Sequence, residues 1–268
     1  MLRLRVKGFV PSGGRRAFAF GLLAWALGPM AAMAAMAAQV AERPASCSSE
    51  GRPRPQALME RFISADCEAC WGDPATPAAP AGTLALDWVV PGARGEEAPL
   101  SAVALPEAAG RLAGTAGATS SGPASSGPAL VVTRSLAPAD RTRQQSLRVA
   151  LGLPINDYVG TSVRLRPAGT GPVSAWVLLV ERLPAGTEGS PVERRLVRGV
   201  FRPDWDMARP GQAPARLEDL RPMRVPEGAR AERLELVAWV EDGQGRPRAI
   251  ALADCGRPGP SGPRRQKR

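Results

Sequence analysis

Short apolar or alternating runs follow one another after residue 56, and such runs are typical of β-strands. Turn-forming Gly, Pro, Asp and Ser residues separate them. The pattern predicts strands at residues 57–64, 83–90, 129–134, 174–182, 194–202, 233–241 and 247–253. It also predicts helices over residues 100–112 and 140–151, the second with Gly152 available to end it.

The spacing of these elements suggests two domains behind a leader and a linker. Residues 38–56 are polar and rich in Pro, which indicates a linker. We expect a first domain over residues 57–153, with both predicted helices. Only strands are expected over residues 154–256, including a hairpin at Asp242-Gly243-Gln244-Gly245, so this part is predicted as an antiparallel β domain. Residues 257–268 are expected to form a disordered basic tail.

The first 37 residues have the pattern of an export signal. Five basic residues and no acid lie in the first 16 positions, and residues 17–38 carry no charge. Ala35-Met36-Ala37 offers a small-x-small cleavage site, so we expect cleavage after Ala37 and a periplasmic mature protein. Arg15-Arg16 leaves a twin-arginine route open beside the general one. The alternative is an uncleaved N-terminal anchor that faces the periplasm, because about 20 apolar residues can span a bilayer.

Charge and composition exclude several function classes. The formal net charge of +10 comes from five basic residues in the leader and five in the tail, which leaves residues 17–256 neutral. With one Tyr and five Phe, the chain offers few stacking platforms, so a nucleic-acid partner is not expected. No histidine is present, which excludes Ser-His-Asp and Cys-His hydrolases and His-ligated zinc. Three tryptophans in strand-like runs are expected to be packing residues: Trp176, Trp205 and Trp239.

A Cys-x-x-Cys pair follows the first predicted strand, which is the placement of a thioredoxin-type dithiol. Two intervening residues let the second thiol attack a mixed disulfide formed at the first. A helix that begins there favours the thiolate form of the first cysteine. Cys67 is therefore the predicted attacking thiol and Cys70 the resolving one. The chain has too few further ligands for a closed zinc site, so we expect no metal and no cofactor.

The residues around this pair resemble a family. Glu60-Arg61-Phe62-Ile63-Ser64-Ala65-Asp66-Cys67-Glu68-Ala69-Cys70 is similar to the strand and dithiol of exported thioredoxin-like proteins, domain-of-unknown-function family twelve-twenty-three. Gly127-Pro128-Ala129-Leu130-Val131-Val132 is similar to that family's segment with the cis-proline that faces the dithiol. The resemblance implies a thioredoxin-like α/β fold, a cis bond at Pro128, and protein thiols or disulfides as partners.

The chain also departs from that family's pattern. Three prolines follow the dithiol closely, at residues 74, 77 and 80, and each disfavours the long helix expected there. Asp66 and Glu68 flank Cys67, and negative charge raises the pKa of a nearby thiol. A weakened or lost oxidoreductase therefore stays open.

The chain has two further cysteines, Cys47 and Cys255. In an oxidising compartment an even set of cysteines usually pairs. We favour a structural disulfide between Cys47 and Cys255, which leaves Cys67 and Cys70 as the redox pair. The alternative is a non-catalytic envelope module in which all four cysteines form structural disulfides. Thiolate copper handling is a third class.

Overall fold

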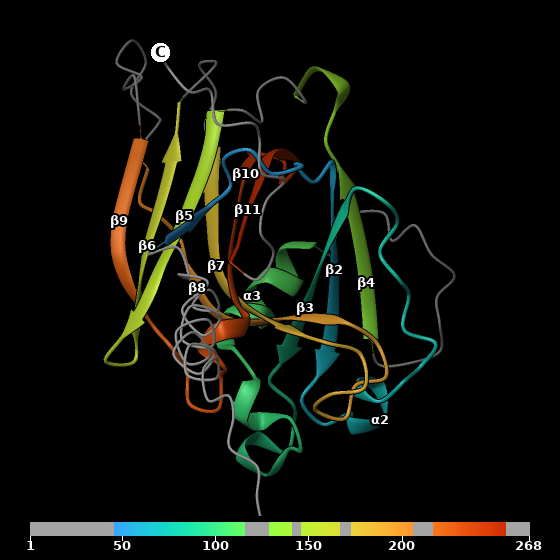
Figure 1. Ribbon diagram of the computed structural model, residues 1–268. Helices are drawn as coiled ribbons and strands as arrows, with labels where there is room; N and C mark the ends of the chain where they lie inside the picture. Colours follow the sequence, from blue (N-terminus) through green and yellow to red (C-terminus); the bar gives the residue numbers. More distant parts are fainter. Residues whose placement is uncertain (1–45, 116–128, 141–145, 167–172, 206–216, 256–268) are drawn as a thin grey trace, which may run out of the picture. The chain divides into compact units, whose positions relative to one another are not determined.

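The computed structural model describes residues 46–115, 129–140, 146–166, 173–205 and 217–255. In these residues eleven β-strands stand beside only two α-helices, α2 (Glu68–Trp71) and α3 (Pro106–Thr115) (Figure 1). Short 3-10 helices are η2 (Gly95–Glu97), η3 (Ser101–Val103), η4 (Pro138–Asp140) and η6 (Ala231–Arg233). The described chain is mostly β-sheet, so the predicted thioredoxin-like α/β fold is wrong, because that fold requires more helices.

Seven strands form a curled mixed sheet in the order β11-β10-β7-β8-β3-β2-β4. Their bounds are β2 (Ala57–Ser64), β3 (Thr83–Val90), β4 (Ala129–Ser135), β7 (Val173–Leu183), β8 (Arg194–Phe201), β10 (Leu234–Asp242) and β11 (Pro247–Asp254). β2 is parallel to β3, and β3 is parallel to β8 through one pair, Asp87 with Leu196. Parallel neighbours need a crossover connection, and residues 65–82, which contain the Cys-x-x-Cys, cross from β2 to β3.

A second, four-stranded sheet is antiparallel and has the order β1-β5-β6-β9. Its strands are β1 (Ser46–Ser48), β5 (Leu147–Ile155), β6 (Tyr158–Leu165) and β9 (Leu217–Arg224). Asn156 and Asp157 connect β5 to β6 with φ of 48° and 62°. Asn and Asp tolerate this left-handed region better than other side chains, and a two-residue turn with positive φ matches the twist of a hairpin.

The larger sheet is covered on both faces, and alternate residues of strand β7 belong to the cores on its two faces. Val177 and Leu179 belong to a core shared with the smaller sheet. Trp176 and Leu178, at the alternate positions, belong to a core on the other face, where Ala108 of α3 also packs. Because both faces are buried, β7 and β10 are almost continuously apolar in sequence.

Strand β5 replaces a predicted helix. The structure starts β5 at Leu147, so the prediction of a helix over residues 140–151 is wrong. Leu147, Val149 and Leu151 are all buried, and apolar residues at every second position have the period of a strand. The predicted domain boundary between residues 153 and 154 falls inside β5, and strands from both sides of it join in the larger sheet.

Other predicted elements agree with the structure. The strands at residues 57–64 and 83–90 have the predicted bounds, and the hairpin at Asp242-Gly243-Gln244-Gly245 joins β10 to β11. The predicted helix over residues 100–112 corresponds to η3 and α3. The export signal (residues 1–37) and the whole tail (residues 257–268) lie outside the described residues.

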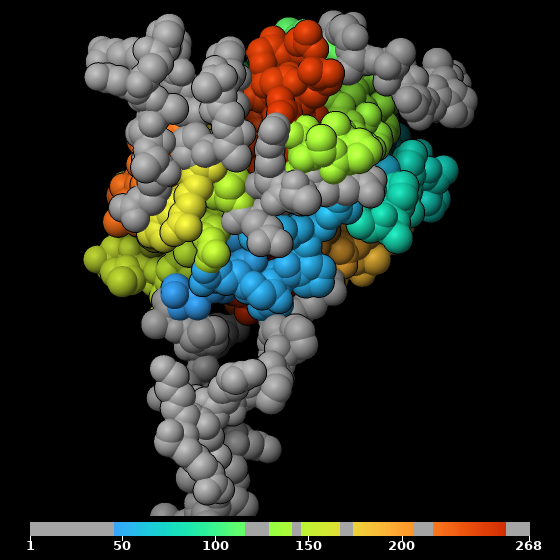
Figure 2. Space-filling view, turned by 90° about the horizontal axis from the view of Figure 1, so that it is seen from above, coloured from blue at the N-terminus to red at the C-terminus, as the bar shows by residue number. Residues whose placement is uncertain are grey.

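A disulfide between Cys47 and Cys255 joins the two sheets. Cys47 lies on β1 of the smaller sheet, and Cys255 follows the last residue of β11 in the larger one. In Figure 2 the blue start of the described chain lies against yellow-green residues of the smaller sheet, in keeping with the pairing of β1 with β5. The two disulfides of the chain suggest an oxidising, extracytoplasmic location. No helix among the described residues has the length and apolar character needed to cross a membrane.

We predict that this disulfide contributes much more stability than the one between Cys67 and Cys70. The separations are 208 and 3 residues, and loop-closure entropy then gives about 5 kcal/mol for the first and about 2 kcal/mol for the second. The double variant Cys47→Ser/Cys255→Ser should therefore lose more free energy of unfolding in urea than Cys67→Ser/Cys70→Ser. Equal losses in the two double variants would contradict a clamp between the sheets.

Candidate functional site

The Cys-x-x-Cys pair lies at the carboxyl end of β2, where the sequence places it. Cys67 is the N-cap of α2, and it forms a disulfide with Cys70 across a Cα–Cα distance of 5.3 Å. The backbone amide of Cys70 donates to the Cys67 sulfur at 3.2 Å, and both cysteines are partly exposed. The disulfide therefore lies within reach of solvent, in the first turn of a helix that ends after one turn.

Asp66, directly before Cys67, fastens the loop that follows β3. Its carboxylate accepts hydrogen bonds from the backbone amides of Ala93 (2.6 Å) and Arg94 (3.2 Å). Burial alone would raise the pKa of the Asp66 carboxyl. The two hydrogen bonds and the Arg94 charge outweigh that effect and hold the pKa below its usual value. A Cβ added at Gly92 would lie 2.3 Å from the Asp66 Cγ, so only glycine permits this close approach.

The backbone of the dithiol turn rests on a buried ion-pair network that was not predicted as part of the site. Arg194 of β8 is fully buried and donates to the Trp71 carbonyl at 2.7 Å and to Asp87 at 2.8 Å. Its guanidinium also lies 4.5 Å from the centre of the Trp71 ring. Arg61 donates to the second Asp87 oxygen at 2.7 Å. Burial lowers the pKa of Arg194, and Asp87 opposes that effect.

Pro128, the predicted cis-proline, lies outside the described residues, so its role stays a prediction. The following strand, β4, pairs antiparallel with β2, and Ala129 lies opposite Ile63.

A second group of charges lies on the opposite face of the larger sheet. Arg111 of α3 donates to both oxygens of Glu60 at 2.8 Å and to both oxygens of Glu241 at 3.0 Å. The indole nitrogens of Trp176 and Trp239 donate to the same Glu241 carboxylate at 2.8 and 3.1 Å. Although burial itself lowers it, the pKa of Arg111 is raised by the carboxylates of Glu60 and Glu241.

Aromatic rings support this group. The rings of Trp176 and Trp239 are parallel, with centres 5.7 Å apart, and the Arg111 guanidinium lies 4.9 and 5.1 Å from those centres. Both tryptophans are buried, as predicted for packing residues. Arg134 of β4 adds a second ion pair to Glu60.

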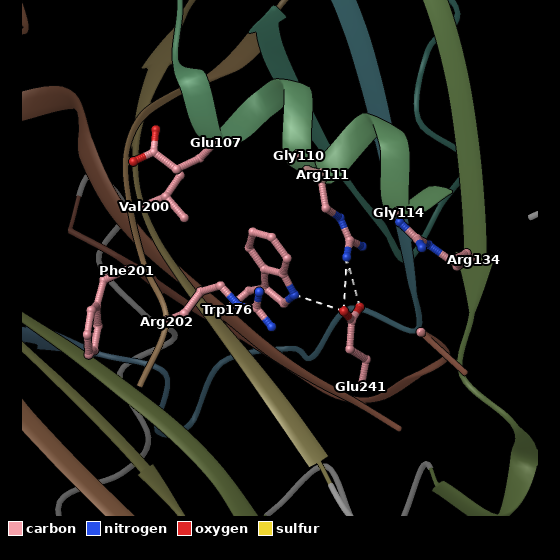
Figure 3. A pocket seen from close by; sticks show the side chains of 11 residues that line it. Glu107, Gly110, Arg111, Gly114, Arg134, Trp176, Val200, Phe201, Arg202 and Glu241 are labelled. Carbon is pink, nitrogen blue, oxygen red and sulfur yellow. Dashed lines mark hydrogen bonds and ion pairs between the residues drawn. The ribbon is translucent and has the colours of Figure 1, made fainter. Parts of the chain in front are cut away.

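A pocket of about 570 Å³ opens beside this group, between α3 and the larger sheet (Figure 3). It is lined by Glu107, Gly110, Arg111, Gly114, Arg134, Trp176, Val200, Phe201, Arg202, Glu241 and Gly245. None of the charged residues in this set was predicted from the sequence as a site residue. One available signal was the presence of charged residues inside apolar runs, such as Glu60 and Arg61 within β2.

Comparisons with protein-family models, with curated proteins and with solved structures found no match for this chain. The resemblance to the exported thioredoxin-like family therefore stays a prediction, and the candidate sites are interpreted from their own geometry.

We predict that Arg111 is required for stability. The variant Arg111→Met keeps the helix propensity of α3 but leaves the buried carboxylates of Glu60 and Glu241 without their main partner, which should cost roughly 3–5 kcal/mol in the free energy of unfolding. Arg164→Met is the matched control, because it removes an exposed ion pair with Glu218 and should cost about 1 kcal/mol or less. Urea unfolding measures both, and losses of equal size would contradict the importance of the buried network.

We also predict an acid-sensitive contribution from Asp66. Because the folded-state pKa of Asp66 is lowered, its stabilising effect is fully present above the unfolded-state value of about 3.9 and is lost as the pH falls through the folded-state value. The melting temperatures of the wild type and Asp66→Asn should therefore differ at pH 6 and converge toward pH 3.

Gly92→Ala tests the same contact from the other side, because the added Cβ displaces the Asp66 carboxylate. It should lower the melting temperature at pH 6, and the loss should shrink toward pH 3 as it does for Asp66→Asn. A loss from Gly92→Ala that is the same at both pH values would show that the carboxylate is not what the glycine accommodates.

Proposed function

We propose that this protein is an extracytoplasmic thiol–disulfide exchange protein and that Cys67 and Cys70 are its reactive pair. The observation that carries the proposal is the position of the pair: a partly exposed disulfide in the first turn of a helix, with the Cys70 amide directed at the Cys67 sulfur. Amide donors at a helix start favour a thiolate at the first cysteine. The fold around the pair is the β-rich one described above.

The two disulfides differ in the way that this proposal requires. Cys47 and Cys255 close a long loop and hold two sheets together, which is the role of a structural disulfide. Cys67 and Cys70 are three residues apart and lie on one turn, so their bond constrains little chain. A structural explanation is therefore stronger for the first pair than for the second.

The exchange involves no cofactor. A thiolate of a protein substrate attacks the Cys67 sulfur, the Cys67–Cys70 bond breaks, and Cys70 leaves as a thiolate that takes a proton from water. A second substrate thiolate attacks the substrate sulfur of the mixed disulfide, which forms the substrate disulfide and releases Cys67. The substrate loses two electrons and the Cys67–Cys70 pair gains them. In the opposite direction, Cys67 is the attacking thiolate and Cys70 resolves the mixed disulfide.

We further propose that the protein works in a bacterial periplasm, to which the leader pattern of residues 1–37 directs it. The partners are then exported proteins with thiols or disulfides. An uncleaved leader would hold the same domain at the membrane, facing the periplasm.

A second candidate function is a non-catalytic envelope module with two structural disulfides. Arg194 favours it, because this buried side chain holds the Trp71 carbonyl and lies 3.5 Å from the Cys70 carbonyl, so the dithiol turn is fixed to the sheet. When a thiolate attacks Cys67, the bond to Cys70 breaks and the two sulfurs must move apart. A rigid support of the turn opposes this movement.

Equilibration with glutathione separates the two candidates. If the pair exchanges, Cys67 and Cys70 reach equilibrium with mixed reduced and oxidised glutathione at a potential above about −300 mV, the range below which structural disulfides usually lie. Differential alkylation and mass spectrometry report the redox state of each pair. The Cys47–Cys255 pair in the same sample is the internal control and should stay oxidised.

Single substitutions then assign the roles. With oxidised glutathione as the probe, Cys70→Ser should accumulate a mixed disulfide at Cys67, because the resolving thiol is gone, whereas wild-type protein should not. A Cys67–Cys70 pair that resists reduction as strongly as Cys47–Cys255 would overturn exchange and leave the structural module.

A further inference from the structure

The pocket beside α3 is bordered by an unusual helix face. Gly110 and Arg111 follow Glu107 by three and four residues, and Gly114 follows them by four and three, so the four share one broad face of α3, and all of them line the pocket. Glycine inside a helix is less favourable than alanine. Among the described residues, nothing lies within 4 Å of a Cβ added at Gly110 or Gly114. Packing in the described chain therefore does not require these glycines, and their effect is to keep the pocket wall open.

The acidic groups at the pocket are already paired with donors of the protein itself. Glu241 accepts from Arg111 and from two tryptophans, and Glu60 accepts from Arg111 and Arg134. These two acids and two arginines neutralise each other. The buried carboxylates are thus already occupied by protein donors and offer little to a ligand.

Arg202 keeps accessible, unused donors at the pocket. Arg202 is exposed, and its guanidinium lies 4.5 Å from the centre of the Trp176 ring; within the described chain no carboxylate pairs with it. The Nε of Arg134 has no acceptor among the described residues, but it is closed off from solvent and so is not available to a ligand. Figure 3 shows Arg202 beside Trp176 and Arg134 on the far side of Arg111, while Glu107 lies at the opposite end of the pocket from Arg134.

From these observations we propose that the pocket binds a small organic oxyanion, in which a carboxylate or phosphate is attached to a flat apolar body. The oxyanion binds the exposed guanidinium of Arg202, since a guanidinium binds either group with paired hydrogen bonds. The apolar body occupies the space between Trp176, Val200 and the bare helix face at Gly110. The volume of about 570 Å³ lies in the range of small-molecule sites.

The rim acid sets the orientation of this ligand. Glu107 is exposed and lines the same pocket, so it repels an anionic group placed next to it. The charged end of the ligand therefore lies toward Arg202, and the apolar end lies toward Glu107.

The proposal does not depend on thiol exchange. Glu60 faces the pocket side of the larger sheet, whereas its neighbour Arg61 points to the other face, where Asp87 and Arg194 hold the dithiol turn. A variant without Cys67 and Cys70 should bind the ligand as the wild type does.

Isothermal titration calorimetry on the full chain tests the site with three probes of one shape. Naphthalene-2-carboxylate and 2-naphthyl phosphate carry the two oxyanions, and naphthalene-2-carboxamide is the neutral analogue. We expect saturable binding of at least one anion, at least tenfold tighter than binding of the amide. The comparison between carboxylate and phosphate identifies which oxyanion the site prefers.

Three variants locate the binding. Arg202→Gln should weaken the preferred anion at least tenfold and leave the weak binding of the amide unchanged. Gly110→Leu should abolish binding of both by filling the pocket. Glu107→Gln should tighten the anion, because it removes the repulsion at the rim. Arg224→Gln, on exposed β9 away from the pocket, is the matched control and should change nothing.

Thermal melts distinguish the loss of the binding site from the loss of the fold. Leucine is a better helix former than glycine, so Gly110→Leu should have a melting temperature at or above that of the wild type while it loses binding. Absence of saturable binding to either anion overturns the proposal, as does anion binding that Arg202→Gln and Gly110→Leu leave unchanged. Tighter binding of 2-naphthylmethylammonium, weakened by Glu107→Gln, would also overturn it and identify a cation site instead.

Discussion

Two adjacent charges in the middle of strand β2 constrain what packs on each face of the larger sheet. Glu60 and Arg61 are both buried, and because neighbouring side chains of a strand point to opposite faces, each enters a different core. A buried charge without a partner costs several kcal/mol. Each face of the larger sheet must therefore supply a charge of opposite sign at this level of β2.

The partners of these two charges are also the residues that build the candidate sites. Arg111 pairs with Glu60 and brings α3 against the sheet, which forms one wall of the pocket. On the other face Arg61 pairs with Asp87, which also binds Arg194, and Arg194 holds the backbone of the dithiol turn. The ion pairs that support the dithiol turn and those that border the pocket thus lie on opposite faces of one strand.

The sequence predicts local features well and the fold class poorly, for physical reasons. Strands at residues 57–64 and 83–90 were recognisable because their apolar runs end at turn residues. The prediction of a helix over residues 140–151 is wrong because Leu147, Val149 and Leu151 follow the period of a strand. The prediction gave more weight to the signals for the ends of a helix than to this period. The resemblance around Cys67 extends over one strand and one turn, which does not determine how eleven strands pair. Arg111 meets its partners across 51 and 130 residues, and no local pattern reveals such contacts.

The buried ion pairs fix the orientation of α3, which apolar packing alone would not. Replacing a buried ion pair by apolar residues is often neutral or stabilising, so stability alone does not explain Glu60, Arg111 and Glu241. On α3, Ala108 is fully buried and Leu112 packs against the same core while partly buried, so the apolar contact of the helix is small and fixes its rotation about its own axis only weakly. The forked bonds from Arg111 to Glu60 and Glu241 fix that rotation, because two carboxylates on different strands accept from one guanidinium. With the rotation fixed, Gly110 and Gly114 face the pocket, so the buried charges determine which surface of α3 a ligand meets.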